Sequence, residues 1–379
     1  MSSRKIGRRG FIKRLSSAFL GVMGTQFWSH LPSADSADSP GPEFRTLGRT
    51  GLKTSAVSMG VMNCSDPAVL QRAYDLGINF YDTADCYMGG RNEEMVGRVF
   101  KGRRDKVIIQ TKVHSNDEKK MRASVDRSLK RLQTDYLDIL VWHDLHSPKE
   151  VSDPHLDEFM MKMKKEGKVR FTGFSAHSNM ASLLIEASKL KYHDVALVSY
   201  NFTHSKKLKE AVALATKSGI GIVAMKTQAG GYKKEKMRGL SPHQAALKYV
   251  LMDQNVSAAI PGVTTLEQME ECAAVMGSLV SKNDIETLER YQSFLQGRVC
   301  TMCGGCTGAC PHGVLLCDPL RVVMYHDGYE NDALVNESSG MVVMNEIDRC
   351  SECPSCSVTC RRGLDIKEQI RLAQRILSA

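Results

Sequence analysis

Between about residue 45 and residue 296, short apolar runs alternate with longer stretches in which apolar residues lie three and four positions apart. Such short runs are typical of buried strands, and the three-and-four spacing is typical of amphipathic helices. The strand candidates are residues 56–59, 78–81, 107–110, 137–141, 169–174, 195–198, 221–224 and 256–260. Because eight strands alternate with helices over roughly 240 residues, the pattern predicts an α/β fold, a (β/α)8 TIM barrel.

The clearest helical patterns cover residues 121–132 and 242–252. The segment Phe44–Ser55 is rich in turn formers and precedes the first strand candidate, so we expect a hairpin that closes the bottom of the barrel. The pattern gives the barrel domain the boundaries 41–296. It leaves a segment at 1–40 before the barrel and a smaller region at 297–379 after it.

Composition places the chain among soluble globular proteins, with 42% hydrophobic and 25% charged residues in a chain of 379. The net charge of +9 is unevenly distributed, because six of the basic residues lie within 1–40 against only Asp35 and Asp38. That segment carries +4 and the other 339 residues carry +5. No basic tract with interleaved aromatic residues is present, so a nucleic-acid partner is not expected.

The basic N-terminus has the pattern of an export signal. Arg8 and Arg9 precede Gly10-Phe11, and a mildly apolar run covers residues 15–28. Paired arginines before a short apolar run are typical of twin-arginine signals, and this run is too short for a transmembrane span. We therefore expect a twin-arginine signal and linker over 1–40, the export machinery as a partner, and a periplasmic or other extracytoplasmic location. A disordered basic tail with an amphipathic anchor is the alternative.

Eight of the twelve cysteines fall into two runs with the spacing C-x2-C-x2-C-x3-C. The runs are Cys300, Cys303, Cys306 and Cys310, followed by Pro311, and Cys350, Cys353, Cys356 and Cys360, followed by Arg361 in place of a proline. This spacing is typical of bacterial ferredoxins, in which thiolates hold [4Fe–4S] clusters. The sequence therefore predicts two [4Fe–4S] clusters in a small ferredoxin-like iron–sulfur domain over 297–379.

In two-cluster ferredoxins the fourth cysteine of each run binds the other cluster. By that rule, Cys360 joins the first three cysteines of the first run, and Cys310 joins the first three of the second. Zinc sites, which need four ligands each, and a disulfide scaffold are the alternatives. Neither requires a repeated triplet of cysteines.

Four reactive residues follow consecutive predicted strands. Asp82 and Tyr87 follow the second strand, Lys112 ends the third, and His143 ends the fourth. Active sites of TIM barrels lie at the carboxyl ends of the strands. A nearby lysine cation lowers the pKa of a tyrosine, a carboxylate holds the lysine, and a histidine polarises a carbonyl oxygen. These catalytic candidates form a set that protonates an alkoxide as hydride reaches carbon.

From Arg45 to about residue 280 the chain resembles the aldo/keto reductase family. The resemblance rests on Phe80–Ala84 with Tyr87, on Gly167–Arg170 followed by Gly173–Ser175, and on Ile260–Gly262. It implies a catalytic tetrad of Asp82, Tyr87, Lys112 and His143. Together with the cysteine region, the chain is similar to an exported, ferredoxin-bearing branch of that family.

The resemblance also implies NAD(P)H as a candidate cofactor, bound without a Rossmann motif. The family's nicotinamide contacts align with Ser175, Ala176 and Leu197, of which only Ser175 keeps the family's residue type. The cations that hold the 2′-phosphate align with Gly262 and Gln268, so an NADPH preference is not expected. The cofactor-binding candidates are Ser175, Lys226, Gly262, Thr264, Gln268 and Glu271.

Two hypotheses follow. The first is an oxidoreductase that acts on a small-molecule carbonyl or alcohol, with Tyr87 as proton donor and the clusters carrying electrons to or from a redox partner protein. The second is an iron–sulfur electron-transfer or docking protein whose barrel is catalytically vestigial. The retention of all four tetrad residue types favours the first hypothesis.

Replacing Arg8 and Arg9 together by lysine should keep the protein in the cytoplasm, because a receptor for paired arginines reads the guanidinium fork and not charge alone. Cell fractionation followed by immunoblotting measures the outcome, with Arg4→Lys as the control that should still be exported. An unchanged distribution of the double variant would contradict the predicted signal.

Overall fold

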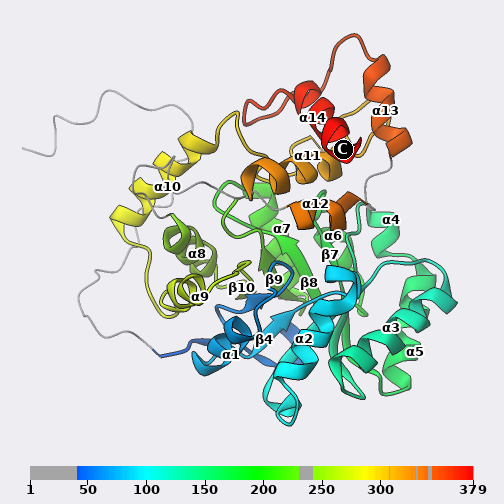
Figure 1. Cartoon of the computed structure of the whole chain (residues 1–379), viewed down its shortest axis with the longest axis vertical. Coiled ribbons are helices and arrows are strands. Elements are labelled where there is room, and N and C mark those ends of the chain that lie inside the picture. The colour runs from blue at the N-terminus through cyan, green and yellow to red at the C-terminus, as the bar shows by residue number, and fades with distance from the viewer. Residues whose placement is uncertain (1–40, 230–241, 307, 330–331, 340–343, 379) are drawn as a thin grey trace, which may run out of the picture. The chain divides into compact units, whose positions relative to one another are not determined.

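The computed structural model describes residues 41–229, 242–306, 308–329, 332–339 and 344–378 (Figure 1). Eight parallel strands form one sheet in chain order. They are β3 (Met59–Gly60), β4 (Phe80–Asp82), β5 (Ile108–Val113), β6 (Leu137–Trp142), β7 (Val169–Ala176), β8 (Val195–Ser199), β9 (Gly221–Met225) and β10 (Val256–Ala259). Parallel bridges from Val57 to Ala259 and from Gly60 to Gly262 join the first strand to the last, so the predicted (β/α)8 barrel is confirmed.

Helices surround the barrel, as Figure 1 shows. They are α1 (Pro67–Asp75), α2 (Arg91–Val99), α3 (Glu118–Leu132), the short α4 (Pro148–Val151), α5 (Pro154–Lys165), α6 (Met180–Ala187), α7 (Lys206–Lys217), α8 (His243–Met252), α9 (Leu266–Ala273) and α10 (Lys282–Leu295). The predicted strands differ from the observed ones mainly at their ends. The largest shift is at the first strand, where residues 56–58 precede β3 and reach β10 only through backbone bonds of Val57 and its neighbours.

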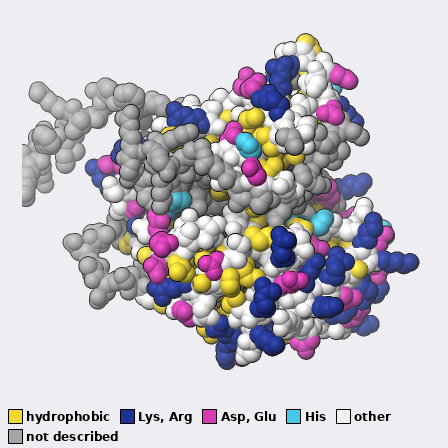
Figure 2. Space-filling view, in the orientation of Figure 1, with side chains coloured by type: hydrophobic (Ala, Val, Ile, Leu, Met, Phe, Trp, Pro, Cys, Tyr) yellow, Lys and Arg dark blue, Asp and Glu magenta, His cyan; other side chains and the backbone are white. Residues whose placement is uncertain are grey.

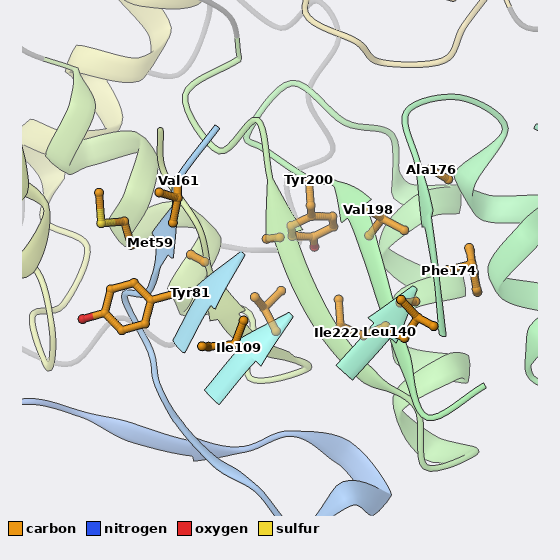
Figure 3. Packing of buried hydrophobic residues seen from close by; sticks show 14 of the residues in the cluster. Met59, Val61, Tyr81, Ile109, Leu140, Phe174, Ala176, Val198, Tyr200 and Ile222 are labelled. Atoms are coloured by element: carbon orange, nitrogen blue, oxygen red, sulfur yellow. The ribbon is translucent and has the colours of Figure 1, made fainter. Parts of the chain in front are cut away.

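The strands bury side chains on both faces, because helices cover the outside and side chains fill the inside. Figure 3 shows the outer layer, in which Met59, Tyr81 and Ile109 belong to the cluster between sheet and helices. The inner layer contains Phe80, Ile139 and nine further residues. Adjacent positions such as Phe80 and Tyr81 thus face opposite layers.

The predicted hairpin is present as β1 (Phe44–Thr46) paired antiparallel with β2 (Lys53–Ser55). Leu47, at its turn, is fully buried and belongs to the inner layer of the barrel. Gly48 has φ +49°, and a Cβ added there would lie 2.3 Å from the Gly221 nitrogen at the start of β9. The close approach requires glycine, and it places the hairpin against the amino ends of the strands, which confirms that it closes the bottom.

The region after the barrel is helical in its described part. It contains α11 (Cys317–Val323), the π-helix η5 (Met324–Gly328), α12 (Asp332–Ser339), α13 (Met344–Glu352) and α14 (Ile366–Ser378), and no strand among its described residues. Its similarity to ferredoxins therefore lies in the cysteine spacing. It has its own hydrophobic cluster, which includes Leu320 and Ile370, and Met62 of the barrel packs against it.

The described residues, from 41 onward, form one compact unit. Within it, the cysteine region contacts the barrel loop that follows β8. In that loop, the Nε2 atom of His204 lies 3.0 Å from the carbonyl oxygen of Met302. Arg362 donates to the carbonyl oxygen of Thr203. Both ends of the cysteine region thus contact the carboxyl side of the barrel, where the mouth lies.

Charge is distributed unevenly on the face shown in Figure 2, where Lys and Arg side chains gather over α2, α3 and α5. Within the described residues, no helix is long and apolar enough to cross a membrane. The predicted signal at 1–40 lies outside the described residues.

Candidate active site

The four predicted catalytic residues line one cavity at the carboxyl end of the barrel. Asp82 is the last residue of β4, Lys112 lies near the end of β5, and His143 follows β6 directly. Tyr87 begins a short 3-10 turn, η2 (Tyr87–Gly90), after β4. Because the strands are parallel and adjacent, their ends bring side chains that are 61 residues apart in the chain (82 to 143) into one site. The cavity has an empty volume of about 670 Å³, part of which is open to solvent.

Lys112 is fixed by contacts with the backbone and with a carboxylate. Its Nζ donates to Oδ2 of Asp82 at 2.7 Å and to the carbonyl oxygen of Thr83 at 2.6 Å. Gln110 donates to the other oxygen of Asp82 at 2.7 Å. Burial raises the pKa of Asp82, and the contacts with Lys112 and Gln110 oppose that rise. The lysine Nζ lies 4.7 Å from the centroid of the Tyr87 ring, so its position over the phenol is fixed by Asp82.

His143 meets Tyr87 edge to face, with ring centroids 6.0 Å apart and an interplanar angle of 79°. The Cys86 sulfur lies 3.9 Å from its Nδ1. Burial lowers the pKa of His143 to about 3, and the charge of Lys112 acts in the same direction. A neutral imidazole keeps one N–H, so His143 is able to donate a hydrogen bond to a substrate oxygen at neutral pH.

The predicted cofactor residues divide into two groups. Ser175, Lys226 and Gly262 line the cavity with the tetrad. Thr264, Gln268 and Glu271 are not among its lining residues. Gln268 instead accepts hydrogen bonds at Oε1 from the Thr264 nitrogen at 2.8 Å and from its hydroxyl at 3.1 Å, at the start of α9. The structure therefore brings three of the six candidates to the four predicted catalytic residues.

Sequence reasoning missed two tyrosines that line the same cavity. Tyr325 and Tyr329 come from η5 and the residue after it, between the two cysteine runs, with ring centroids 5.6 Å apart. Lys226, the residue after β9, donates from Nζ to the Tyr325 hydroxyl at 2.6 Å. Burial, followed by the charge of Arg321, lowers the pKa of Lys226 to about 7. The four-residue spacing of the tyrosines was the one signal in the sequence that could have placed them on a common face.

Arg321 of α11 was also missed. Its Nη1 donates to Oδ2 of Asp144 at 2.8 Å, and its Nη2 donates to Oδ1 of Asp318 at 2.9 Å. The arginine is 2% exposed, and Asp144 is the residue next to His143. Burial alone would raise the pKa of Asp144, but the Arg321 guanidinium and the neighbouring histidines together outweigh burial and hold that pKa well below its usual range. A buried ion pair thus joins the cysteine region to the side chain of the residue that follows His143.

The structure brings the eight cysteines into two groups, all as free thiols. Burial raises the pKa of Cys300 to about 12, and the negative charges of Cys306, Cys303 and Cys360 add to that rise. Burial also raises the pKa of Cys350, and there Cys310, Cys353 and Cys356 contribute. A second cavity, of about 440 Å³, is lined by these four cysteines, Cys310, Cys350, Cys353 and Cys356. The fourth cysteine of each run therefore lies with the other run, as the ferredoxin rule requires.

A model of the aldo/keto reductase family matches residues 65–239 and 232–292, more than half of the chain, so the protein belongs to this family. L-galactose dehydrogenase of Arabidopsis thaliana is 28% identical over 302 residues, which cover 67% of this chain and 94% of the relative. L-glyceraldehyde 3-phosphate reductase of Escherichia coli K12 is 27% identical over 325 residues, covering 66% and 92%. The protein is accordingly an oxidoreductase of the aldo/keto reductase type.

The fold is also that of a solved relative. Aldo-keto reductase AKR11C1 from Bacillus halodurans superposes with a TM-score of 0.56 at 24% identity, over 66% of this chain and 96% of that one. The family match ends at residue 292, before the first of the eight clustered cysteines. The helical region that carries them is therefore an addition to the family barrel.

His143 should make the protein sensitive to acid. Its pKa of about 3 in the folded state lies below the value of about 6.5 expected in the unfolded chain, so acidification below 6.5 protonates only the unfolded form. The neutral histidine stabilises the fold above that pH, and the stability is lost as the pH falls. When the pH is lowered from 7.5 to 5.5, the free energy of unfolding of His143→Gln should fall by about 1.4 kcal/mol less than that of the wild type. Urea unfolding at the two pH values measures this difference.

The control is His155→Gln, because His155 is exposed at the start of α5. This variant should lose as much unfolding free energy between pH 7.5 and 5.5 as the wild type. If acidification lowers the unfolding free energy of the wild type and of His143→Gln equally, the imidazole of His143 is not held neutral in the folded protein.

Proposed function

We propose that this oxidoreductase interconverts a carbonyl and an alcohol group on a small molecule, with Tyr87 as the proton donor and two [4Fe–4S] clusters as the electron route. The observation that carries the proposal is the position of Lys112. Its Nζ is held 2.7 Å from Asp82 and 4.7 Å from the Tyr87 ring centroid, in a cavity that is lined partly by residues of the cysteine region.

Reduction of a carbonyl to an alcohol consumes two electrons and two protons, and the tetrad supplies the proton that goes to oxygen. The proton that goes to carbon comes from solvent, and the two electrons come one at a time from the partner protein through the clusters. The Lys112 cation stabilises negative charge on the phenol oxygen as Tyr87 gives its proton to the developing alkoxide. Asp82 keeps the lysine in place, and His143, as a neutral donor, orients and polarises the carbonyl oxygen. In the reverse direction Tyr87 takes the proton from the alcohol.

The cysteine residues fit iron–sulfur ligation. Eight free thiols form two groups of four, and several of them pack in an apolar cluster with residues such as Leu316 and Ile370. When bound, [4Fe–4S] clusters supply single electrons. The loop that carries the first cysteine run lies against the barrel. Asn201 of the barrel donates through Nδ2 to the carbonyl oxygen of Lys226 at 3.0 Å and to that of Thr301 at 3.4 Å. Thr301 lies between Cys300 and Cys303.

The named relatives support the substrate class, since one is a dehydrogenase of L-galactose and another a reductase of L-glyceraldehyde 3-phosphate. Both names describe hydroxyl or carbonyl chemistry on small polar molecules. NAD(P)H remains a candidate cofactor from the family, although Gly262 and Gln268 offer no cation for a 2′-phosphate. The proposal includes twin-arginine export, which places the electron partner, a second protein, outside the cytoplasm.

Removing only the phenol hydroxyl, by Tyr87→Phe, should lower the turnover of a carbonyl substrate by about 10²–10⁴ if proton transfer limits the rate. Lys112→Met should have a similar effect and shift the pH optimum. Anaerobic turnover with a one-electron dye as the electron partner measures both. Tyr74→Phe is the control, because Tyr74 lies on α1 and packs against Phe100 and Arg103, away from the cavity.

If the barrel were only a scaffold, as in the alternative hypothesis, the redox turnover of Tyr87→Phe would equal that of the wild type. The loss of a cluster ligand would still abolish it. Turnover that survives Tyr87→Phe and fails in a cysteine variant would favour the electron-carrier function.

Anaerobically purified protein should contain about eight irons per chain, together with acid-labile sulfide. Cys356→Ser should lower the iron content and the intensity of the electron paramagnetic resonance signal after dithionite reduction. Cys64→Ala, which removes a buried thiol of the barrel core, should leave the iron content unchanged. Zinc in place of iron at these eight thiols would rule out the proposed electron route.

A further inference from the structure

The cavity that contains the tetrad is also lined by a second set of polar residues. Lys226, Thr227 and His177 line it together with Tyr325, while Tyr87 and His143 line the same space. The proton chemistry described above uses none of the first four residues. A substrate that fills the cavity therefore contacts a second set of polar groups beyond its reacting carbon.

In its protonated form, Lys226 carries a positive charge that forms no ion pair with a described carboxylate. The acidic residues around it are already paired, Asp82 with Lys112 and both Asp144 and Asp318 with Arg321. Its Nζ contacts the Tyr325 hydroxyl and lies 4.4 Å and 5.6 Å from the ring centroids of Tyr325 and Tyr329. These contacts hold the ammonium in place without neutralising it, and further N–H donors remain for a ligand.

Two neighbouring residues are incompletely hydrogen-bonded. The Nδ1 atom of His177 and the hydroxyl of Thr227 are buried and have no partner among the described residues. Both residues line the cavity, and they are 8% and 1% exposed. Buried polar groups normally have partners, so the cavity has unused hydrogen-bonding capacity for a polar ligand at these residues.

We propose that Lys226, held by Tyr325, is a binding site for a carboxylate on the substrate, which is therefore a hydroxy acid or an oxo acid. One ammonium matches the single charge of a carboxylate, and a charge-assisted hydrogen bond in a partly enclosed cavity is strong. The inference rests on the proposed function for the reacting group of the substrate, and it adds a carboxylate as a second group that the cavity recognises.

The proposal gives the cysteine region a role in recognition. Tyr325 lies on η5, between the two cysteine runs, whereas Lys226 lies on the barrel after β9. The carboxylate site is therefore complete only when the two regions are in contact. Arg321, which pairs with Asp144, fixes that contact a single helical turn before Tyr325.

The test measures the binding of hydroxyacetate, 3-hydroxypropanoate and 4-hydroxybutanoate, each against its uncharged amide. Isothermal titration calorimetry on the anaerobically purified, full-length protein gives both affinities. At least one acid should bind about tenfold to a hundredfold more tightly than its amide. Lys226→Gln should remove this preference, and Lys226→Arg should restore part of it.

A matched control exists elsewhere in the molecule. Lys209 donates to the Tyr249 hydroxyl at 2.6 Å and lies 4.9 Å from its ring centroid, outside the cavity. Lys209→Gln therefore removes the same kind of contact and should leave the preference for acids unchanged. Tyr87→Phe should also leave it unchanged, so a failure of the proposed proton donor is distinguishable from a failure of this site.

Equal binding of every acid and its amide by the wild type would overturn the proposal, and so would a preference that survives Lys226→Gln. NADP⁺ and inorganic pyrophosphate are titrated in parallel. If their binding depends on Lys226 and that of the acids does not, the anion is a cofactor phosphate and the substrate assignment is wrong.

Discussion

A buried guanidinium connects the two regions of this protein at the active site. Arg321 is 2% exposed and pairs with Asp144 of the barrel and Asp318 of its own helix. Removing one partner from a buried ion pair lowers stability by about 3–5 kcal/mol, because the remaining charge stays buried without a partner or water to solvate it. Separation of the cysteine region from the barrel would leave Asp144 unpaired next to His143. The ion pair therefore links the residue that follows His143 to a residue some 180 positions later in the chain.

The same contact affects which charged side chains around the cavity are paired. Lys112 is matched by Asp82, and Arg321 is matched by two aspartates, so the paired charges leave Lys226 as a cation without a carboxylate among the described residues. The charges of Arg321 and Lys112 lower the pKa of Lys226, and burial acts in the same direction and more strongly. Near neutral pH an anion that enters the cavity favours the protonated lysine. Substrate binding and protonation at Lys226 are thus coupled.

Much of the site could be predicted because its residues follow local patterns. Asp82, Lys112 and His143 each end or follow an apolar run, and parallel strands bring such ends to one edge. The cysteines follow a fixed spacing, and the association of Cys360 with the first run was predicted from the ferredoxin rule. Positions without such a pattern were less certain, as Thr264, Gln268 and Glu271 show. Their alignment with family contacts did not reveal that they lie outside the cavity.

The sequence by itself determined the barrel, the order of the candidate catalytic residues along the chain and the two cysteine runs, because each depends on spacing within a short segment. The tertiary structure alone decided which residues of the segment between the runs reach the barrel. Arg321, Tyr325 and Tyr329 have no motif, and their role arises from packing against Asp144 and Lys226, which come from distant strands. Contacts between segments so far apart depend on how the whole chain packs, and no local pattern encodes them.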